Sequence, residues 1–125
     1  MPLILILDAD PIFRSVMAKR LQAIGYRTNV AGNGADGLDL ARRFPPAAVL
    51  MDLTLRGASG VDFLRALRAD PALRHTPVVV AASTTDADAL AAAEGLGIDD
   101  HLSKGRTSIG EISDAVETHA FVSEH

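Results

Sequence analysis

The chain has 125 residues, of which 48% are hydrophobic and 22% are charged, and its formal net charge is −4. This length predicts one domain, residues 1–125, with enough apolar residues for a packed core. Because acidic and basic residues are interspersed, we expect neither nucleic acid nor an anionic membrane as the main partner. The absence of cysteine excludes disulfides and thiolate metal sites. No apolar run has the length of a membrane span and no signal peptide precedes the first run, so we expect a cytoplasmic protein.

The first strand and helix are predicted within residues 3–25. Residues 3–7 (LILIL) are an unbroken apolar run, which is typical of a strand buried on both faces of a parallel sheet. Asp10 and Pro11 follow as the N-cap and first residue of a helix, and Gly25 ends it. The predicted buried face of this helix contains Ile12, Phe13, Val16, Met17, Leu21 and Ile24.

Four further pairs of strand and helix are predicted along the chain. The strands are expected at residues 26–31, 47–53, 76–83 and 98–104. The helices are expected at 33–44 (with Leu38, Leu40, Ala41 and Phe44 as the buried face), from Val61 to near Pro71, at 86–94, and from Ser108, which forms a capping box with Glu111. Five alternations without a repeat or linker predict an α/β fold: a single doubly wound parallel sheet with right-handed crossovers and helices on both faces.

Three polar side chains stand at the carboxyl ends of predicted strands: Asp8, Asp52 and Lys104. The carboxyl ends of the strands share one edge of a doubly wound sheet, so one pocket would hold two carboxylates and an ammonium. This set suits acyl phosphate chemistry, in which a carboxylate attacks phosphorus while a divalent cation and a lysine bind the phosphoryl oxygens. Mg²⁺ fits, because it uses one or two carboxylates and keeps several waters. Each residue alone is more often a helix cap or a solvated side chain, and only their convergence favours a phosphate or metal site.

Four segments carry a resemblance that covers essentially the whole chain. They are LDADPIFR (7–14), AAVLMDLTLRGASG (47–60), TPVVVAAS (76–83) and GIDDHLSKG (97–105). In this order and spacing they resemble the receiver domain of two-component response regulators. The resemblance implies a flavodoxin-like (βα)5 fold, with the five strands in the order 2-1-3-4-5.

The resemblance also implies roles for individual residues. Asp52 would be the phosphoacceptor, Asp8 an acid of the magnesium site, and Lys104 the lysine that pairs with the phosphoryl group. The metal would also bind the backbone carbonyl of Thr54. The side chains of Thr54 and Thr84 occupy positions that tune the lifetime of the phosphoryl group in this family.

The sequence departs from the family pattern at the metal site. Receivers usually carry two adjacent acids, of which the second binds the metal directly, and that position is Ala9 here. Asp10 is left as a weaker candidate ligand, because Pro11 and Arg14 fix the register and place Asp10 at the helix cap. We therefore expect Mg²⁺ to bind only weakly.

Further departures fall on the positions that transmit phosphorylation. The switch hydroxyl falls on Ala82, and the neighbouring Ser83 can replace it only if the strand bulges, since adjacent residues point to opposite faces. The aromatic switch position is His101. Two prolines of the pattern are replaced by Arg56 and Gly105. With glycine after Lys104 we expect a trans peptide bond, because a cis bond without proline costs roughly 2.5–4 kcal/mol.

Three functional hypotheses follow. The leading one is an atypical receiver in two-component or phosphorelay signalling, with no enzymatic activity of its own, that is weakly phosphorylated on Asp52. Its expected partners are a histidine kinase or phosphotransfer protein, and a downstream protein bound through the last two helices and the strand between them, with a homodimer left open. The alternative is a phosphorylation-independent pseudo-receiver that serves as an interaction scaffold. A small hydrolase or phosphatase ranks last, because no His, Cys or Ser stands where a general base or second nucleophile is needed.

Overall fold

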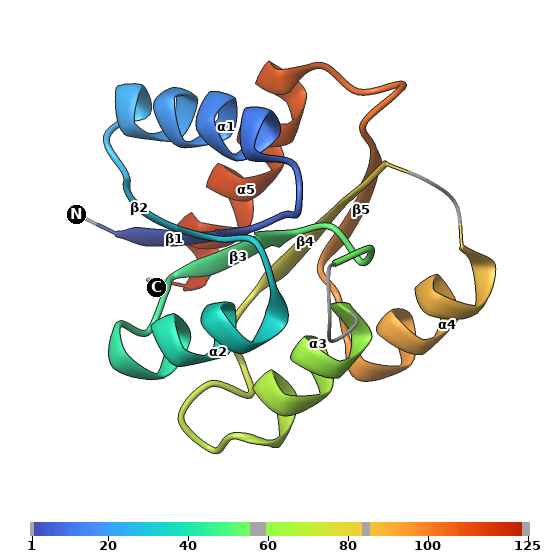
Figure 1. Cartoon of the computed structure of the whole chain (residues 1–125). Coiled ribbons are helices and arrows are strands. Elements are labelled where there is room, and N and C mark those ends of the chain that lie inside the picture. Colours follow the sequence, from blue (N-terminus) through green and yellow to red (C-terminus); the bar gives the residue numbers. More distant parts are fainter. Residues whose placement is uncertain (1, 56–59, 84–85, 124–125) are drawn as a thin grey trace.

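The computed structural model describes residues 2–55, 60–83 and 86–123, with side chains to residue 120 (Figure 1). Strands and helices alternate throughout these residues. In chain order they are β1 (Leu3–Leu7), α1 (Pro11–Ile24), β2 (Arg27–Ala31), α2 (Gly34–Arg43), β3 (Ala48–Met51), α3 (Gly60–Ala69), β4 (Val78–Ala82), α4 (Ala87–Leu96), β5 (Asp100–Ser103) and α5 (Ile109–Ser123).

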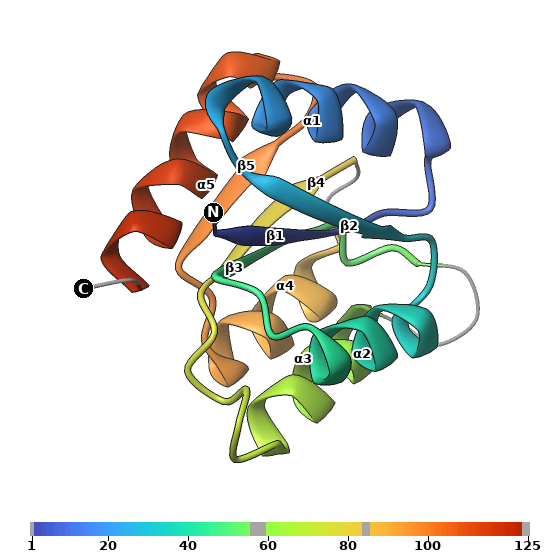
Figure 2. The ribbon, with the colours of Figure 1, turned by 90° about the vertical axis from the view of Figure 1, so that its left-hand side faces the viewer.

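The strands form one parallel sheet in the order β2-β1-β3-β4-β5. Helices α1 and α5 cover one face of the sheet, and α2, α3 and α4 cover the other (Figures 1 and 2). The predicted α/β class, the doubly wound sheet and the strand order are therefore confirmed. Among the helices described, none is long and apolar enough to cross a membrane.

Each central strand contributes side chains to two separate cores, because successive residues of a strand point to opposite faces. On β1, Leu5 and Leu7 pack under α2, α3 and α4, whereas Ile4 and Ile6 pack under α1 and α5. Strands β3 and β4 alternate in the same way. This two-sided burial explains why the central strands are unbroken apolar runs in the sequence.

The predicted helix ends are formed by specific contacts. Asp10 caps α1, its side chain accepting the backbone N–H of Ile12, and Gly25 ends the helix with φ of 117°. Ser108 and Glu111 form the predicted capping box at α5, with reciprocal bonds of 3.1 and 3.2 Å. These caps fix where each helix leaves the sheet edge.

Three details of the helix predictions are wrong. Ile12 and Val16 are 73% and 42% exposed, because α1 is rotated so that Met17 and Leu21 are its buried residues. Phe44 is 51% exposed, since α2 ends at Arg43 and Phe44 leaves the helical path. Helix α4 continues through residue 95 to Leu96, beyond the predicted end at 94.

Replacing Gly95 or Gly97 with alanine should change the free energy of unfolding in opposite directions. An added Cβ at Gly95, inside α4, would meet no atom within 4 Å, whereas Gly97 has φ of +99°. We expect Gly95→Ala to raise the free energy of unfolding by about 0.5–1 kcal/mol, because alanine suits a helix interior better than glycine. Gly97→Ala should lower it by about 1–3 kcal/mol, because L-residues rarely adopt that backbone conformation. Urea denaturation followed by circular dichroism measures both, and a Gly95→Ala variant less stable than the parent would contradict the open environment described here.

Candidate functional site

Two carboxylates and one ammonium meet at the carboxyl edge of the sheet. Asp8 follows β1, Asp52 follows β3 and Lys104 follows β5. The Lys104 Nζ donates to Asp8 Oδ2 at 2.6 Å and to Asp52 Oδ2 at 3.0 Å. Asp8 and Asp52 are only 2% and 3% exposed. The structure thus brings together the three residues that the strand ends were expected to place in one pocket.

The sheet itself positions these residues, because its backbone ladder continues one residue past each strand. The N–H of Asp8 donates to the carbonyl of Ala31, and that of Asp52 to the carbonyl of Leu7, both at 3.0 Å. The N–H of Lys104 donates to the carbonyl of Ala82 at 2.9 Å. Each side chain therefore leaves a backbone that is still held in sheet register.

Asp52 is held in its ionised form by several donors. Its Oδ1 accepts the N–H of Thr54 at 3.0 Å, and its Oδ2 accepts the N–H of Ser83 at 3.2 Å in addition to the Lys104 ammonium. Burial alone would raise the pKa of Asp52, but these hydrogen bonds outweigh it and lower the pKa below its usual value. Asp52 is therefore a carboxylate at neutral pH, the form that can act as a nucleophile.

Asp8 is held less strongly than Asp52. Its carboxylate accepts one backbone N–H, that of Asp10 at 2.9 Å, besides the Lys104 ammonium. Burial raises the pKa of Asp8, and these hydrogen bonds offset the rise only in part. The backbone carbonyl of Asp8 accepts a bond of 2.8 Å from the Arg14 guanidinium, which fixes the turn between β1 and α1.

Lys104 provides the positive charge of the site. Burial would lower its pKa, but the hydrogen bonds to Asp8 and Asp52 raise the pKa above its usual value. The side chain is 15% exposed, and Nζ lies 4.1 Å from the ring centroid of Phe13. The sequence predicted Phe13 only as a core side chain, since no local pattern shows that a residue of the first helix meets the last strand.

Few groups at the carboxyl edge of the sheet could bind a metal ion. The side chain of Asp10 is exposed and caps α1, and only the backbone N–H of Asp10 contacts Asp8. Ala9 offers no donor, and the described residues contain no cluster of three acidic or histidine side chains that could hold a metal. Two carboxylates and the Thr54 backbone carbonyl fit the low end of what Mg²⁺ uses in proteins. Both carboxylates are already bonded to Lys104, so a cation has to compete with the ammonium.

The resemblance assigns Ala82, Ser83 and His101 to the positions that would transmit phosphorylation. Ala82 packs against the core under α2, α3 and α4, and Ser83 is exposed, with its backbone N–H on Asp52. His101 is exposed. No peptide bond in the part of the chain that the structure describes is cis, which confirms the expected trans bond before Gly105.

The loop after Asp52 is described only in part. Thr54 is exposed, whereas Arg56 and Thr84, the other residue expected to tune phosphoryl lifetime, lie outside the described residues. Gly60 begins α3 against the backbone of Leu53, where an added Cβ would lie 2.7 Å from the Leu53 carbonyl oxygen. This close approach explains a glycine eight residues after Asp52.

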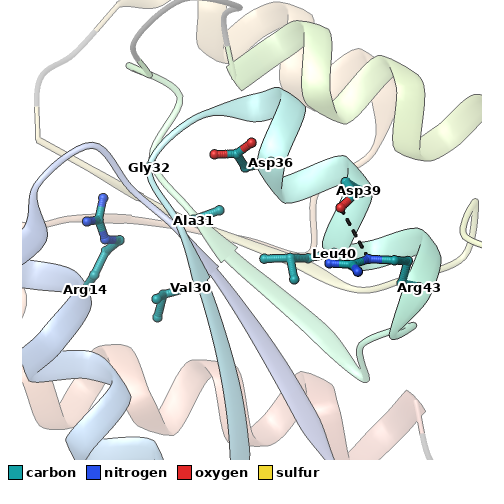
Figure 3. Close-up of a pocket in the computed structure, with 8 residues that line it drawn as sticks. All are labelled: Arg14, Val30, Ala31, Gly32, Asp36, Asp39, Leu40 and Arg43. Carbon is teal, nitrogen blue, oxygen red and sulfur yellow. Dashed lines mark ion pairs between the residues drawn. The ribbon is translucent and has the colours of Figure 1, made fainter.

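A shallow pocket lies beside the site, between α1, β2 and α2 (Figure 3). Its lining comprises Arg14, Val30, Ala31, Gly32, Asp36, Asp39, Leu40 and Arg43. The lining includes two arginines and two aspartates, of which Arg43 pairs with Asp39 at 3.3 Å. Because its charges balance, the pocket offers no net charge to select an ion, and we assign it no role.

Comparison with known proteins agrees with this architecture. The family model described as the response regulator receiver domain matches residues 4–117. The chain is 35% identical over 101 residues to the DNA-binding response regulator MtrA of Mycolicibacterium smegmatis, a match that covers 81% of this chain and 43% of that protein. It is 34% identical over 104 residues to the transcriptional regulatory protein KdpE of Mycobacterium tuberculosis, covering 83% of this chain and 45% of that protein. The chain thus spans less than half the length of these curated relatives.

Two solved structures share the fold at lower identity. The chemotaxis response regulator CheY4 of Vibrio cholerae superposes with a TM-score of 0.85 at 19% identity, covering 95% of this chain and 98% of that one. A response regulator receiver domain protein from Clostridium thermocellum gives a TM-score of 0.85 at 20% identity, covering 99% and 98%. At these identities the likeness bears on the fold alone.

Removing the Lys104 ammonium should show how much free energy it costs to bury two carboxylates without a counter-charge. We expect Lys104→Met to lower the free energy of unfolding at pH 7 by about 3–5 kcal/mol, because both carboxylates lose their counter-charge. The variant should become more stable as the pH falls from 7 to about 5, since burial then raises the pKa of Asp8 and Asp52 and protonation removes the charges. The parent should instead lose stability as the pH rises above 10.5, through the raised pKa of Lys104. Chemical denaturation at a series of pH values measures these trends.

Lys19→Met is the matched control, since Lys19 is exposed on α1. It should leave the stability within about 0.5 kcal/mol of the parent at pH 7. Adding Asp8→Asn to Lys104→Met should restore part of the loss by removing one buried charge. A Lys104→Met variant as stable as the parent at pH 7 would contradict the bridging role of the ammonium.

Proposed function

The chain belongs to the response regulator receiver domain family, and on that premise we propose that residues 1–125 act as one atypical receiver that is phosphorylated weakly on Asp52. Receiver domains are signalling domains that interact with histidine kinases or phosphotransfer proteins, and they typically bind Mg²⁺ at the phosphorylation site. The observation that carries the proposal is the ionised, buried Asp52 with the Lys104 ammonium 3.0 Å from its Oδ2.

The contacts support a direct transfer to Asp52. Its carboxylate oxygen would attack the phosphorus of a phosphohistidine or of acetyl phosphate, and the bond to the donor would break with its electron pair leaving on the donor. Lys104 would pair with an oxygen of the transferred group, and the Ser83 N–H, now 3.2 Å from Asp52 Oδ2, would be a second donor. Asp8, Asp52 and the Thr54 carbonyl would hold Mg²⁺, which neutralises phosphoryl charge when bound.

Partner binding is proposed to be the output. We place the downstream protein contact on the face formed by α4, β5 and α5, with a homodimer through the same face as a second occupant. MtrA is named as DNA-binding, but this chain matches less than half of that protein. The net charge of −4 argues against direct contact with nucleic acid by this chain.

The scaffold alternative is favoured by the absence of three groups. Ala9 lacks the second acid, Ala82 lacks the switch hydroxyl, and His101 replaces the aromatic residue. Lys104 also neutralises part of the charge of the two carboxylates through its ion pairs with Asp8 and Asp52. A domain of this kind would bind partners in its resting conformation and would need no phosphoryl group.

Restoring the second acid tests the phosphorylated receiver against the scaffold alternative. We expect the parent to gain the mass of one phosphoryl group slowly from acetyl phosphate and Mg²⁺, and to bind Mg²⁺ weakly. Ala9→Asp should tighten Mg²⁺ binding on the order of 10-fold or more and speed phosphorylation, because it adds a carboxylate to a hard-cation site. Intact mass spectrometry and a Mg²⁺ titration measure the two effects.

Ala9→Asn controls for the size of the new side chain, and Asp52→Asn for the acceptor. Ala9→Asn should give much less than the gain of Ala9→Asp, and Asp52→Asn should abolish the added mass. If Ala9→Asp binds Mg²⁺ no better than the parent, the assigned pocket is wrong. If neither the parent nor Ala9→Asp is phosphorylated, the scaffold function replaces the proposed one.

Phosphorylation should change the output face very little. Ala82 has no hydroxyl, so the phosphorylated state lacks one hydrogen bond, worth about 0.5–3 kcal/mol, that would favour an active conformation. We expect saturating beryllofluoride, a phosphoryl mimic, to change partner affinity by less than about 10-fold, or 1.4 kcal/mol. Amide hydrogen exchange over residues 86–105 should be nearly unchanged in the same experiment.

Ala82→Thr is the matched variant, because it restores a hydroxyl at the end of β4. With the mimic bound, it should show a larger change of amide exchange over 86–105 than the parent. A parent response above 10-fold would mean that Ser83 or His101 has taken over the coupling.

A further inference from the structure

We propose that Phe13 is a positioning residue for Lys104, whose ring holds the ammonium between Asp8 and Asp52. This inference deepens the proposed function and rests on it only for the effect on phosphorylation. The geometry of the resting site carries it independently. The interaction joins the first turn of α1 to the residue that follows β5.

The ammonium is enclosed by three partners. A lysine ammonium has three N–H donors. Two of them account for the bonds of 2.6 Å to Asp8 and 3.0 Å to Asp52. The ring centroid of Phe13 lies 4.1 Å from Nζ, well within the distance of about 6 Å at which a ring face attracts a cation. With the Lys104 side chain only 15% exposed, this attraction is little weakened by water.

The position of Phe13 is itself fixed by its neighbours. Asp10 caps α1, so Phe13 falls in the first turn, next to the site. Arg14 donates to the carbonyl of Asp8 at 2.8 Å and ties this turn to the end of β1. The guanidinium passes so close to Gly32 that an added Cβ there would lie 2.6 Å from its Nη1. The ring therefore stands on a turn that is anchored to the same strand as Asp8.

The surroundings of Lys104 make this contact important for its placement. The residue after Lys104 is Gly105, which has no proline ring to restrict the backbone. The bond between the two residues is trans. Nζ contacts the two carboxylates, which attract it, and the ring of Phe13, which lies on the side of α1. An ammonium that is held beside Asp52 is already placed for an oxygen of an incoming phosphoryl group, and loss of that placement slows transfer.

The test compares Phe13→Leu, which removes the ring face but keeps apolar volume, with Phe13→Tyr, which keeps the face. In the unphosphorylated protein, the Lys104 ammonium protons are followed by nitrogen-15 NMR, and their exchange with water should be about three- to tenfold faster in Phe13→Leu. The initial rate of phosphorylation by acetyl phosphate should fall by a similar factor. Phe13→Tyr should stay within about twofold of the parent in both measurements.

Leu21→Val controls for loss of packing on α1, because Leu21 is buried in the same core and is remote from Lys104 in the helix. It should lower stability without changing the exchange of the ammonium protons. Unchanged exchange in Phe13→Leu, or an equal change in Leu21→Val, would overturn the proposal. Faster exchange in Phe13→Leu alone supports it even if no variant is phosphorylated, an outcome that would instead reject the proposed function.

Discussion

The interaction on which the site depends is the Lys104 ammonium between two buried carboxylates. An ionised group with almost no contact with water is costly unless it is paired and hydrogen-bonded, and Asp8 and Asp52 are both nearly inaccessible. Their partner follows β5, at the far edge of the sheet, while Asp8 follows β1 near its centre. The charges are therefore compensated only when β1, β3 and β5 are aligned at their carboxyl ends. The site therefore forms only when the sheet has assembled correctly.

The two carboxylates share one ammonium but have different environments. Asp52 accepts two backbone N–H groups, from Thr54 and Ser83, whereas Asp8 accepts one, from Asp10. Both are buried to a similar extent, yet the hydrogen bonds lower the pKa of Asp52, whereas burial and the nearby charge of Asp52 raise the pKa of Asp8. The backbone at the ends of β3 and β4 thus favours charge on Asp52, the residue proposed to act as the nucleophile, and less so on Asp8.

Structural features that depend on neighbouring residues can be predicted from the sequence, whereas features that depend on distant residues cannot. The run LILIL predicted a doubly buried strand, and Asp10, Ser108 and Glu111 predicted helix starts, because strands and caps are set locally. The exposure of Ile12 was missed, since the rotation of α1 is decided by how Met17 and Leu21 fit the sheet.

No pattern in the sequence predicts the contacts between loops that are distant along the chain. Arg68 donates to the carbonyls of Arg74, Thr76 and Gly97, which ties together two loops at the amino edge of the sheet. The convergence of Asp8, Asp52 and Lys104 was predictable because parallel strands end at one edge. The contact of Phe13 with Lys104 was not, because it depends on the final position of α1 over that edge.

The charge balance of the site shows what the alanine at position 9 changes. In the resting site two carboxylates face one ammonium, which leaves one net negative charge for a cation to meet. A phosphoryl group on Asp52 would replace one negative charge by about two and would add oxygen ligands. A divalent cation should therefore be held more firmly after phosphorylation than before it, because it meets more negative charge and more donors. By linkage, Mg²⁺ would then favour the phosphorylated state in this site even though its resting affinity is low. The side chain of Ala9 offers no oxygen ligand in either state, and phosphoryl oxygens would supply part of that missing charge only after phosphorylation.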